Sequence, residues 1–279
     1  MVESINTSEG CLKEPMAFFI CGVFTPTFLT ILGVIMYIRL PWVVGNAGII
    51  GACLIILVAV AITITTALSL SSITTNIRIG SGGAFSLISQ SLGLEIGGAI
   101  GIPFFFSQAI AVAMYIFGFR EGLQSILPEY SPLILDLLIF TLVMVIAFIS
   151  TSFAFKIQYV IMAIIILSIF SIVGGLFITD LNYEFTWLGD YAGSKENNFG
   201  GSSFWLVFAV FFPAVTGVMA GANMSGDLKN PRKSIPNGTL SAVVITTVVY
   251  LGMVVVAALL ASPKDLVSNY NIFISNWDD

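Results

Sequence analysis

The chain has 279 residues, of which 57% are hydrophobic and only 9% are charged, and its mean hydropathy is +1.02. This composition excludes a soluble globular domain and is typical of a polytopic helical membrane protein, because several apolar runs exceed the ~20 residues that span a bilayer. The net charge of -5 argues against a nucleic-acid partner, and the absence of histidine excludes histidine-based catalysis and histidine metal sites.

Seven apolar segments follow one another along the chain, and each is long enough to cross a bilayer as a helix. With the N-terminus inside, six lysines and arginines lie on the inner side and four on the outer side. This bias predicts a multi-pass protein of the cell membrane with a cytoplasmic N-terminus. We predict the segments at 17–44, 49–70, 96–123, 133–150, 157–178, 204–223 and 235–260.

The sequence predicts one transmembrane domain, 16–261, between two short flanking parts. The tail at 1–15 is polar and acidic, and the apolar run after it is far longer than a signal-peptide core. We therefore expect a cytosolic tail and no cleaved signal. Residues 262–279 are expected on the extracellular side. The chain has three cysteines, Cys11, Cys21 and Cys53. Because they are few and odd in number, we expect them to be packing residues and not a disulfide framework.

The first segment contains an interruption. Pro26, Thr27, Thr30 and Gly33 break an otherwise apolar run, and proline and glycine both weaken a helix. After the second segment, the Gly-rich stretch 74–101 lacks the Gly-Lys-Ser/Thr ending of a phosphate-binding loop. We interpret that stretch as a short re-entrant or interfacial segment that enters the third helix through small residues.

The third segment carries a tyrosine and an acid in apolar surroundings. Tyr115 needs a partner for its hydroxyl, which is either a neighbouring carbonyl or a bound cation. Glu121 near the outer end of this helix and Arg39 near the outer end of the first segment either pair in the protein interior or reach separately toward the headgroups.

The sixth segment is interrupted like the first, because Pro213, Thr216 and Gly217 fall where a simple spanning helix would carry Leu or Ile. Residues 33–36 and 217–220 are also similar in sequence. A broken helix exposes carbonyls that suit a cation and amides that suit an anion. Two broken helices five segments apart favour an inverted-repeat transporter with a site at the midplane, whereas two independent kinks are the plainer alternative.

Four stretches together resemble the cation-chloride cotransporter family, which is part of the amino acid–polyamine–organocation superfamily. They read LGVIMYIRLPWVVGNAG, GGAFSLISQSLGLEIGGAIG, AVAMYIFGFREG and FFPAVTGVMAGANMSGDLKNPRKSIPNGTL. The resemblance implies an all-α, leucine-transporter-type inverted-repeat fold. It also implies electroneutral symport of chloride with potassium, sodium or both, and neither a cofactor nor enzymatic ATP use.

The same resemblance implies positions for the site. The implied potassium site uses oxygens at Thr30, Ile31, Tyr115, Pro213 and Thr216. One implied chloride lies on the amides of Gly33, Val34 and Ile35, and a second lies near Gly217, Val218 and Met219. Arg39 and Glu121 match the pair that closes the outer gate. Many relatives carry Asn where this chain has Thr30, which affects the details of the cation site.

Several alternatives stay open at this point. The family has helices beyond the seventh, so we expect a gene fragment, a frameshifted product or half of a split protein, and the sequence does not decide whether sodium is transported. The expected partners are chloride and alkali cations, the lipid bilayer, and a second copy or a complementary fragment. An amino-acid permease is the alternative carrier, although one glycine with bulky neighbours at 30–36 leaves little room for a zwitterion. A non-transporting membrane relic is the third possibility.

Overall fold

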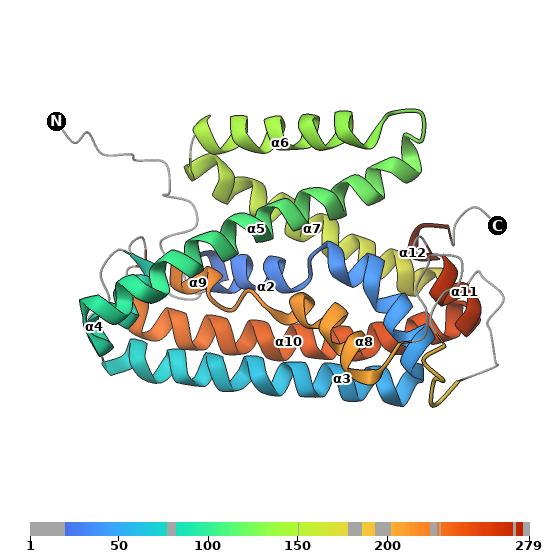
Figure 1. Cartoon of the computed structure of the whole chain (residues 1–279), viewed down its shortest axis with the longest axis horizontal. Coiled ribbons are helices and arrows are strands. Elements are labelled where there is room, and N and C mark those ends of the chain that lie inside the picture. Colours follow the sequence, from blue (N-terminus) through green and yellow to red (C-terminus); the bar gives the residue numbers. More distant parts are fainter. Residues whose placement is uncertain are drawn as a thin grey trace. The chain divides into compact units, whose positions relative to one another are not determined.

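The computed structural model describes residues 20–76, 82–149, 151–177, 186–192, 202–223, 228, 230–269 and 272–275, and all regular structure in these ranges is helical (Figure 1). The expected all-α class is therefore confirmed. The helices in chain order are η1 (Ile20–Phe24), α2 (Thr25–Ile31), α3 (Val34–Asn76), α4 (Gly83–Leu92), α5 (Leu94–Ile126), α6 (Pro132–Ile149), α7 (Thr151–Gly175), α8 (Phe204–Phe211), η2 (Phe212–Val215), α9 (Ala220–Asn223), α10 (Pro231–Leu260), α11 (Pro263–Ser268) and α12 (Ile272–Ser275).

Within the described ranges, five helical stretches are long and apolar enough to cross a membrane, and the shorter apolar helices Gly22–Ile31 and Pro132–Phe148 accompany them. Each of the seven predicted segments overlaps one or more of these helices. The first two share α3, which bends at Gly48, where φ is 71° and ψ is 178°. The chain is an integral membrane protein. The predicted tail at 1–15 lies outside the described residues.

Two of the membrane helices are interrupted (Figure 1). α2 ends at Ile31, a bend follows, and α3 begins at Val34. α8 ends at Phe211 and passes into the 3-10 turn η2, where Pro213 cannot donate a helix hydrogen bond. Gly217 then has a φ of 113°, a backbone conformation that residues with a Cβ rarely adopt. The second interruption thus follows from local chemistry.

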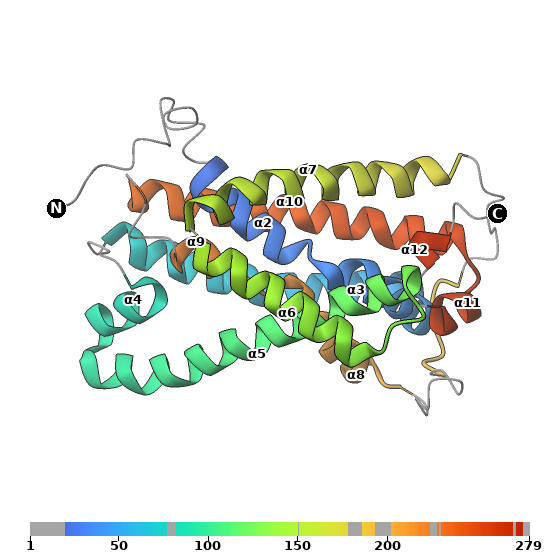
Figure 2. The ribbon, with the colours of Figure 1, turned by 90° about the horizontal axis from the view of Figure 1, so that it is seen from above.

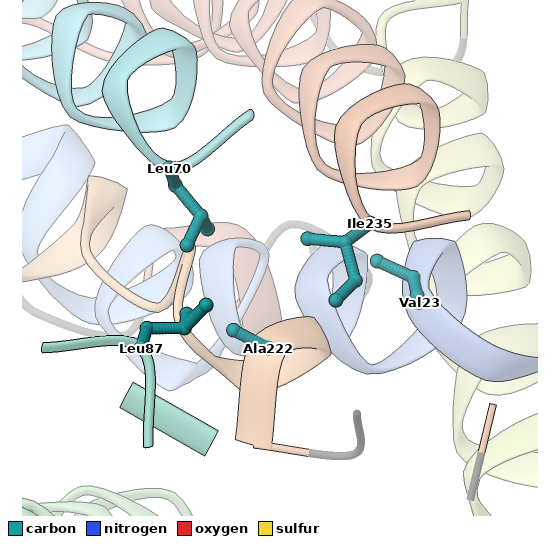
Figure 3. Packing of buried hydrophobic residues seen from close by; sticks show 5 residues of the cluster. All are labelled: Val23, Leu70, Leu87, Ala222 and Ile235. Atoms are coloured by element: carbon teal, nitrogen blue, oxygen red, sulfur yellow. The ribbon is translucent and has the colours of Figure 1, made fainter. Parts of the chain in front are cut away.

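The chain divides into two compact units. Unit 1 is drawn from Met1–Ile31, Ile62–Phe105 and Gly217–Thr246, and unit 2 from Leu32–Ala61, Phe106–Thr216 and Thr247–Asp279. Unit 1 has a small apolar cluster to which five different elements contribute one buried side chain each (Figure 3). Because these elements are far apart in the sequence, the cluster holds unit 1 together. Its members are Val23, Leu70, Leu87, Ala222 and Ile235.

The Gly-rich stretch forms a corner between α4 and α5 in unit 1 (Figure 2). Gly93 separates the two helices with a φ of 96° and donates its N–H to the Ser89 carbonyl at 3.0 Å. α5 therefore begins at Leu94, two residues before the predicted start. Residues 77–81 of this stretch lie outside the described residues.

A loop segment docks on the bend of α3 in unit 2. The bend removes intrahelical partners, and the loop replaces them: the amides of Ile49 and Ile50 donate to the carbonyls of residues 186 and 187 at 3.1 and 3.0 Å. In return, Gly189 donates its N–H to the Ala47 carbonyl at 2.9 Å. Asn46 is buried and accepts a hydrogen bond from the Ser202 hydroxyl at 3.2 Å. Residues 186–192 thus satisfy backbone groups that the bend leaves open.

We expect Gly189→Ala to destabilise the protein, because a Cβ at this position would collide with the Asn46 carbonyl and lie 2.7 Å from the Ala47 carbonyl carbon. Overpacking of this kind costs about 1–3 kcal/mol. Thermal unfolding in detergent measures the effect. Gly174→Ala in α7 is the matched control, since its Cβ would meet no atom within 4 Å. Equal unfolding temperatures for the two variants would contradict the docked loop.

Candidate functional site

Unit 2 contains a cavity of about 600 Å³, which we call the α5 cavity. Its lining comes from the first turns of α3, from the second half of α5, and from the end of α8 with η2. Most of the lining is apolar, and the charged residues on it are two arginines and one glutamate. Five residues that the sequence proposed for ion binding or gating lie on this wall: Val34, Ile35, Arg39, Glu121 and Pro213.

Arg39 of α3 and Glu121 of α5 form an ion pair in the α5 cavity. The guanidinium Nη2 lies 3.6 Å from the carboxylate Oε1, and the two side chains are 35% and 41% exposed. The sequence left open whether these side chains pair or reach separately toward the headgroups, and the structure pairs them. Because the pair is only partly exposed, its charges are less screened than a surface pair.

The N-terminal end of α3 contributes Val34 and Ile35 to the same wall. The amides of a first helical turn have no partner within their own helix and carry partial positive charge. Here the turn is tightened by a hydrogen bond from the Met36 amide to the Gly33 carbonyl at 3.1 Å. α5 approaches it closely, since a Cβ on Gly118 would lie 2.6 Å from Val34 Cγ1. An electropositive helix end therefore borders the cavity.

Two of the proposed cation ligands in unit 2 contact each other. The Thr216 hydroxyl donates a hydrogen bond to the Pro213 carbonyl at 2.7 Å. Pro213 lines the α5 cavity, while Thr216 is exposed and stands outside the set of lining residues. Tyr115 is half-buried on α5, next to the lining residue Met114. The Pro213–Thr216 pair thus offers two oxygens side by side, as a cation requires.

The remaining proposed ligands lie in unit 1, where Thr30 meets Gly217. The Thr30 hydroxyl lies 2.9 Å from the carbonyl oxygens of both Pro26 and Thr27 and 3.3 Å from that of Gly217. The three carbonyl oxygens are acceptors for the single hydroxyl proton of Thr30, so this hydroxyl already has hydrogen-bond partners within the protein. Gly217 has no room for a side chain, because a Cβ would lie 2.6 Å from Thr30 Oγ1.

The other unit 1 positions are mostly buried. Ile31 is 2% exposed and Val218 is 7% exposed. Met219 packs against the apolar cluster of unit 1. The structure describes these residues within unit 1, and their ion-binding roles stay predictions.

Sequence reasoning missed two features of unit 2. Arg120 also lines the α5 cavity and forms an ion pair with Asp136 of α6, with Nη1 and Oδ2 3.2 Å apart. A single carboxylate within the apolar α6 was a signal for a partner, because ionisable groups at membrane depth usually pair. Tyr250 is fully buried and donates its hydroxyl to the Ala214 carbonyl at 3.3 Å. α10 thereby supports the η2 turn.

Comparison with known proteins gives concordant matches. The model of the family described as "Amino acid permease" matches residues 22–276. "Solute carrier family 12 member 2" of Danio rerio is 39% identical over 99% of this chain and 25% of its own length. The protein of the same name from Homo sapiens is 43% identical over 89% of this chain and 22% of its own length.

A third relative is "Solute carrier family 12 member 1" of Mus musculus, which is 40% identical over 85% of this chain and 23% of its own length. The chain thus spans about a quarter of the length of the curated relatives it matches. The family match covers most of the chain and agrees with the resemblance drawn from the four sequence stretches. The chain belongs to the amino acid permease family, and within it to the cation-chloride cotransporters of solute carrier family 12.

Proposed function

We propose that the protein carries chloride across the cell membrane together with potassium, sodium or both, as an electroneutral symporter without enzymatic activity, and that its N-terminus is cytoplasmic. The observation that carries the proposal is the α5 cavity in a chain 39–43% identical to members of solute carrier family 12. An electropositive helix end, an ion pair and the Pro213 carbonyl on one wall suit small ions of both signs.

The chloride part of the proposal is supported by Gly33, Val34 and Ile35. Their backbone lies where α3 begins, at the end of a helix that attracts anions, and the last two residues line the cavity. The potassium part is supported by the Pro213 carbonyl and the Thr216 hydroxyl, which lie 2.7 Å apart. Tyr115 supplies a third oxygen in the proposal.

Chloride-dependent rubidium uptake tests the function. The assay compares cells in chloride medium with cells in gluconate medium, with and without sodium. Because the chain is about a quarter as long as its relatives, it is assayed both by itself and fused to the remaining sequence of the Danio rerio relative. Uptake of rubidium only with chloride supports the proposal. Uptake of amino acids without rubidium would instead support an amino-acid permease.

Tyr115→Phe and Thr216→Ala are each expected to reduce rubidium uptake at low rubidium concentration. Each removes one proposed ligand oxygen, and a lost polar contact to a charged group costs about 1.5–3 kcal/mol, so the apparent affinity should fall by at least about tenfold. Thr216→Ser keeps the hydroxyl and should retain most of the activity. Tyr130→Phe is the control for the phenol, since Tyr130 is exposed in the turn before α6. Unchanged uptake in both variants at normal surface expression would refute these ligands.

A further inference from the structure

The ion pair between Arg120 and Asp136 is a second charged feature of the α5 cavity, separate from the Arg39–Glu121 pair. Asp136 is the single charged residue of α6, whose sequence is PLILDLLIFTLVMVIAFI. A carboxylate in such a helix is costly unless it is paired, and Arg120 Nη1 supplies the partner at 3.2 Å. The side chains are 28% and 18% exposed, so this pair is more buried than the Arg39–Glu121 pair.

The contact between Arg120 and Asp136 leaves hydrogen-bonding capacity unused on both sides. A guanidinium has five N–H donors, and the carboxylate meets it through one nitrogen and one oxygen. Within the part of the chain that the structure describes, Arg120 Nε and Asp136 Oδ1 are buried and have no hydrogen-bond partner. Buried polar atoms rarely stay without partners, so each group keeps hydrogen-bonding capacity for a further partner, and of the two only Arg120 lines the cavity.

Arg120 also changes the charge of the cavity wall. The charged lining residues are Arg39, Arg120 and Glu121, and with Asp136, which is paired with Arg120 but is not part of the lining, the four charges sum to zero. Asp136 holds Arg120 from α6, while the arginine itself lines the cavity. The Phe117 ring lies beside the guanidinium, with its centroid 5.4 Å from Cζ. The positive member of the Arg120–Asp136 pair lies on the cavity lining and the negative member does not, which favours an anion at this part of the wall.

We propose that Arg120 is an anion-recruiting residue, which binds a monovalent inorganic anion such as chloride in the α5 cavity through its free N–H donors. Asp136 is its positioning residue, because it fixes the guanidinium without using all of its donors. The rest of the lining is apolar and offers few further donors, which disfavours phosphate or a carboxylate ligand. The inference rests on the proposed function, in which chloride passes through this cavity.

A labelling experiment tests the anion site without any need for transport. The purified chain is treated with phenylglyoxal, which modifies arginine, in chloride or in gluconate at equal ionic strength, and modified peptides are quantified by mass spectrometry. Chloride should slow the modification of Arg120 by about fivefold, the effect of a weak charge–charge contact. Arg232, which is exposed at the start of α10, should react equally in both salts. Equal modification of Arg120 in both salts would overturn the inference.

Uptake kinetics separate anion recruitment from a structural link between α5 and α6. Arg120→Gln should raise the KM for chloride about fivefold with a near-normal maximal rate, and Arg120→Lys should raise it less. The exchange Arg120→Asp with Asp136→Arg keeps the ion pair but removes the positive charge from the wall, so it should not restore the KM. A normal KM in the exchanged protein would show that the pair is only a structural link. If no version takes up rubidium, the proposed function fails, and the labelling result still decides the anion site.

Discussion

Replacing Glu121 with glutamine is expected to lower chloride-dependent rubidium uptake by about tenfold, because it leaves Arg39 opposite a neutral amide on the wall of the α5 cavity. The side chains are 35% and 41% exposed, so the pair lies between surface pairs and buried pairs. Surface pairs contribute at most about 1 kcal/mol and broken buried pairs cost about 3–5 kcal/mol, so we expect about 1–2 kcal/mol here.

The charge exchange Arg39→Glu with Glu121→Arg should recover part of the uptake, because it preserves the attraction between α3 and α5. Additive losses in the cycle of Arg39→Gln and Glu121→Gln would mean that the two side chains do not interact in the transporting protein. Glu95→Gln is the matched control, since Glu95 is an exposed acid in the first turn of the same helix.

A second measurement asks whether the pair controls access to the α5 cavity. Met114→Cys places a thiol on the cavity wall, in a chain whose own cysteines are replaced by serine. If the pair closes the cavity to the outside, Glu121→Gln should speed the reaction of this thiol with a membrane-impermeant reagent. An unchanged labelling rate together with reduced uptake would assign the pair a structural role and not that of a gate.

Gly217→Ala is expected to abolish uptake and to lower stability, since the substitution meets two obstacles at once. The backbone φ of 113° is unfavourable for alanine, and the new Cβ would lie 2.6 Å from Thr30 Oγ1 and 2.8 Å from Thr30 Cβ. Strain at such a position costs about 1–3 kcal/mol, which is enough to displace the turn after Thr216.

The added variant Thr30→Gly tests which obstacle dominates. It removes the colliding side chain but leaves the strained φ, so a partial recovery of stability would measure the collision alone. Gly252→Ala in α10 is the control, because a Cβ there would meet no atom within 4 Å. Normal uptake and normal thermal stability of Gly217→Ala would contradict the described conformation of this turn.

Features that depend on neighbouring residues could be predicted from the sequence. The apolar runs located the membrane helices, and Pro213 with Gly217 located the interruption after α8, because proline and glycine act within a turn of their position. The family resemblance, and not the periodicity of the sequence, singled out five residues that lie on one cavity wall: Val34, Ile35, Arg39, Glu121 and Pro213.

Contacts between distant residues could not be predicted in the same way. Arg120 and Asp136 are 16 positions apart on two helices, and only the turn between those helices brings them together. The Thr30 hydroxyl and the Gly217 carbonyl are 187 positions apart. No local pattern indicates such a partner, whereas a lone carboxylate in an apolar helix does indicate that some partner is needed.

The loop that docks on the bend at Gly48 has a consequence for biosynthesis. When α3 leaves the ribosome, the carbonyl groups that later accept hydrogen bonds from the amides of Ile49 and Ile50 do not yet exist. They belong to residues 186 and 187, which are synthesised only after four further helices. These two hydrogen bonds therefore form only late in synthesis, after the early part of the chain has been made. Hydrogen exchange at these amides during translation would then report the moment at which the two halves of unit 2 assemble.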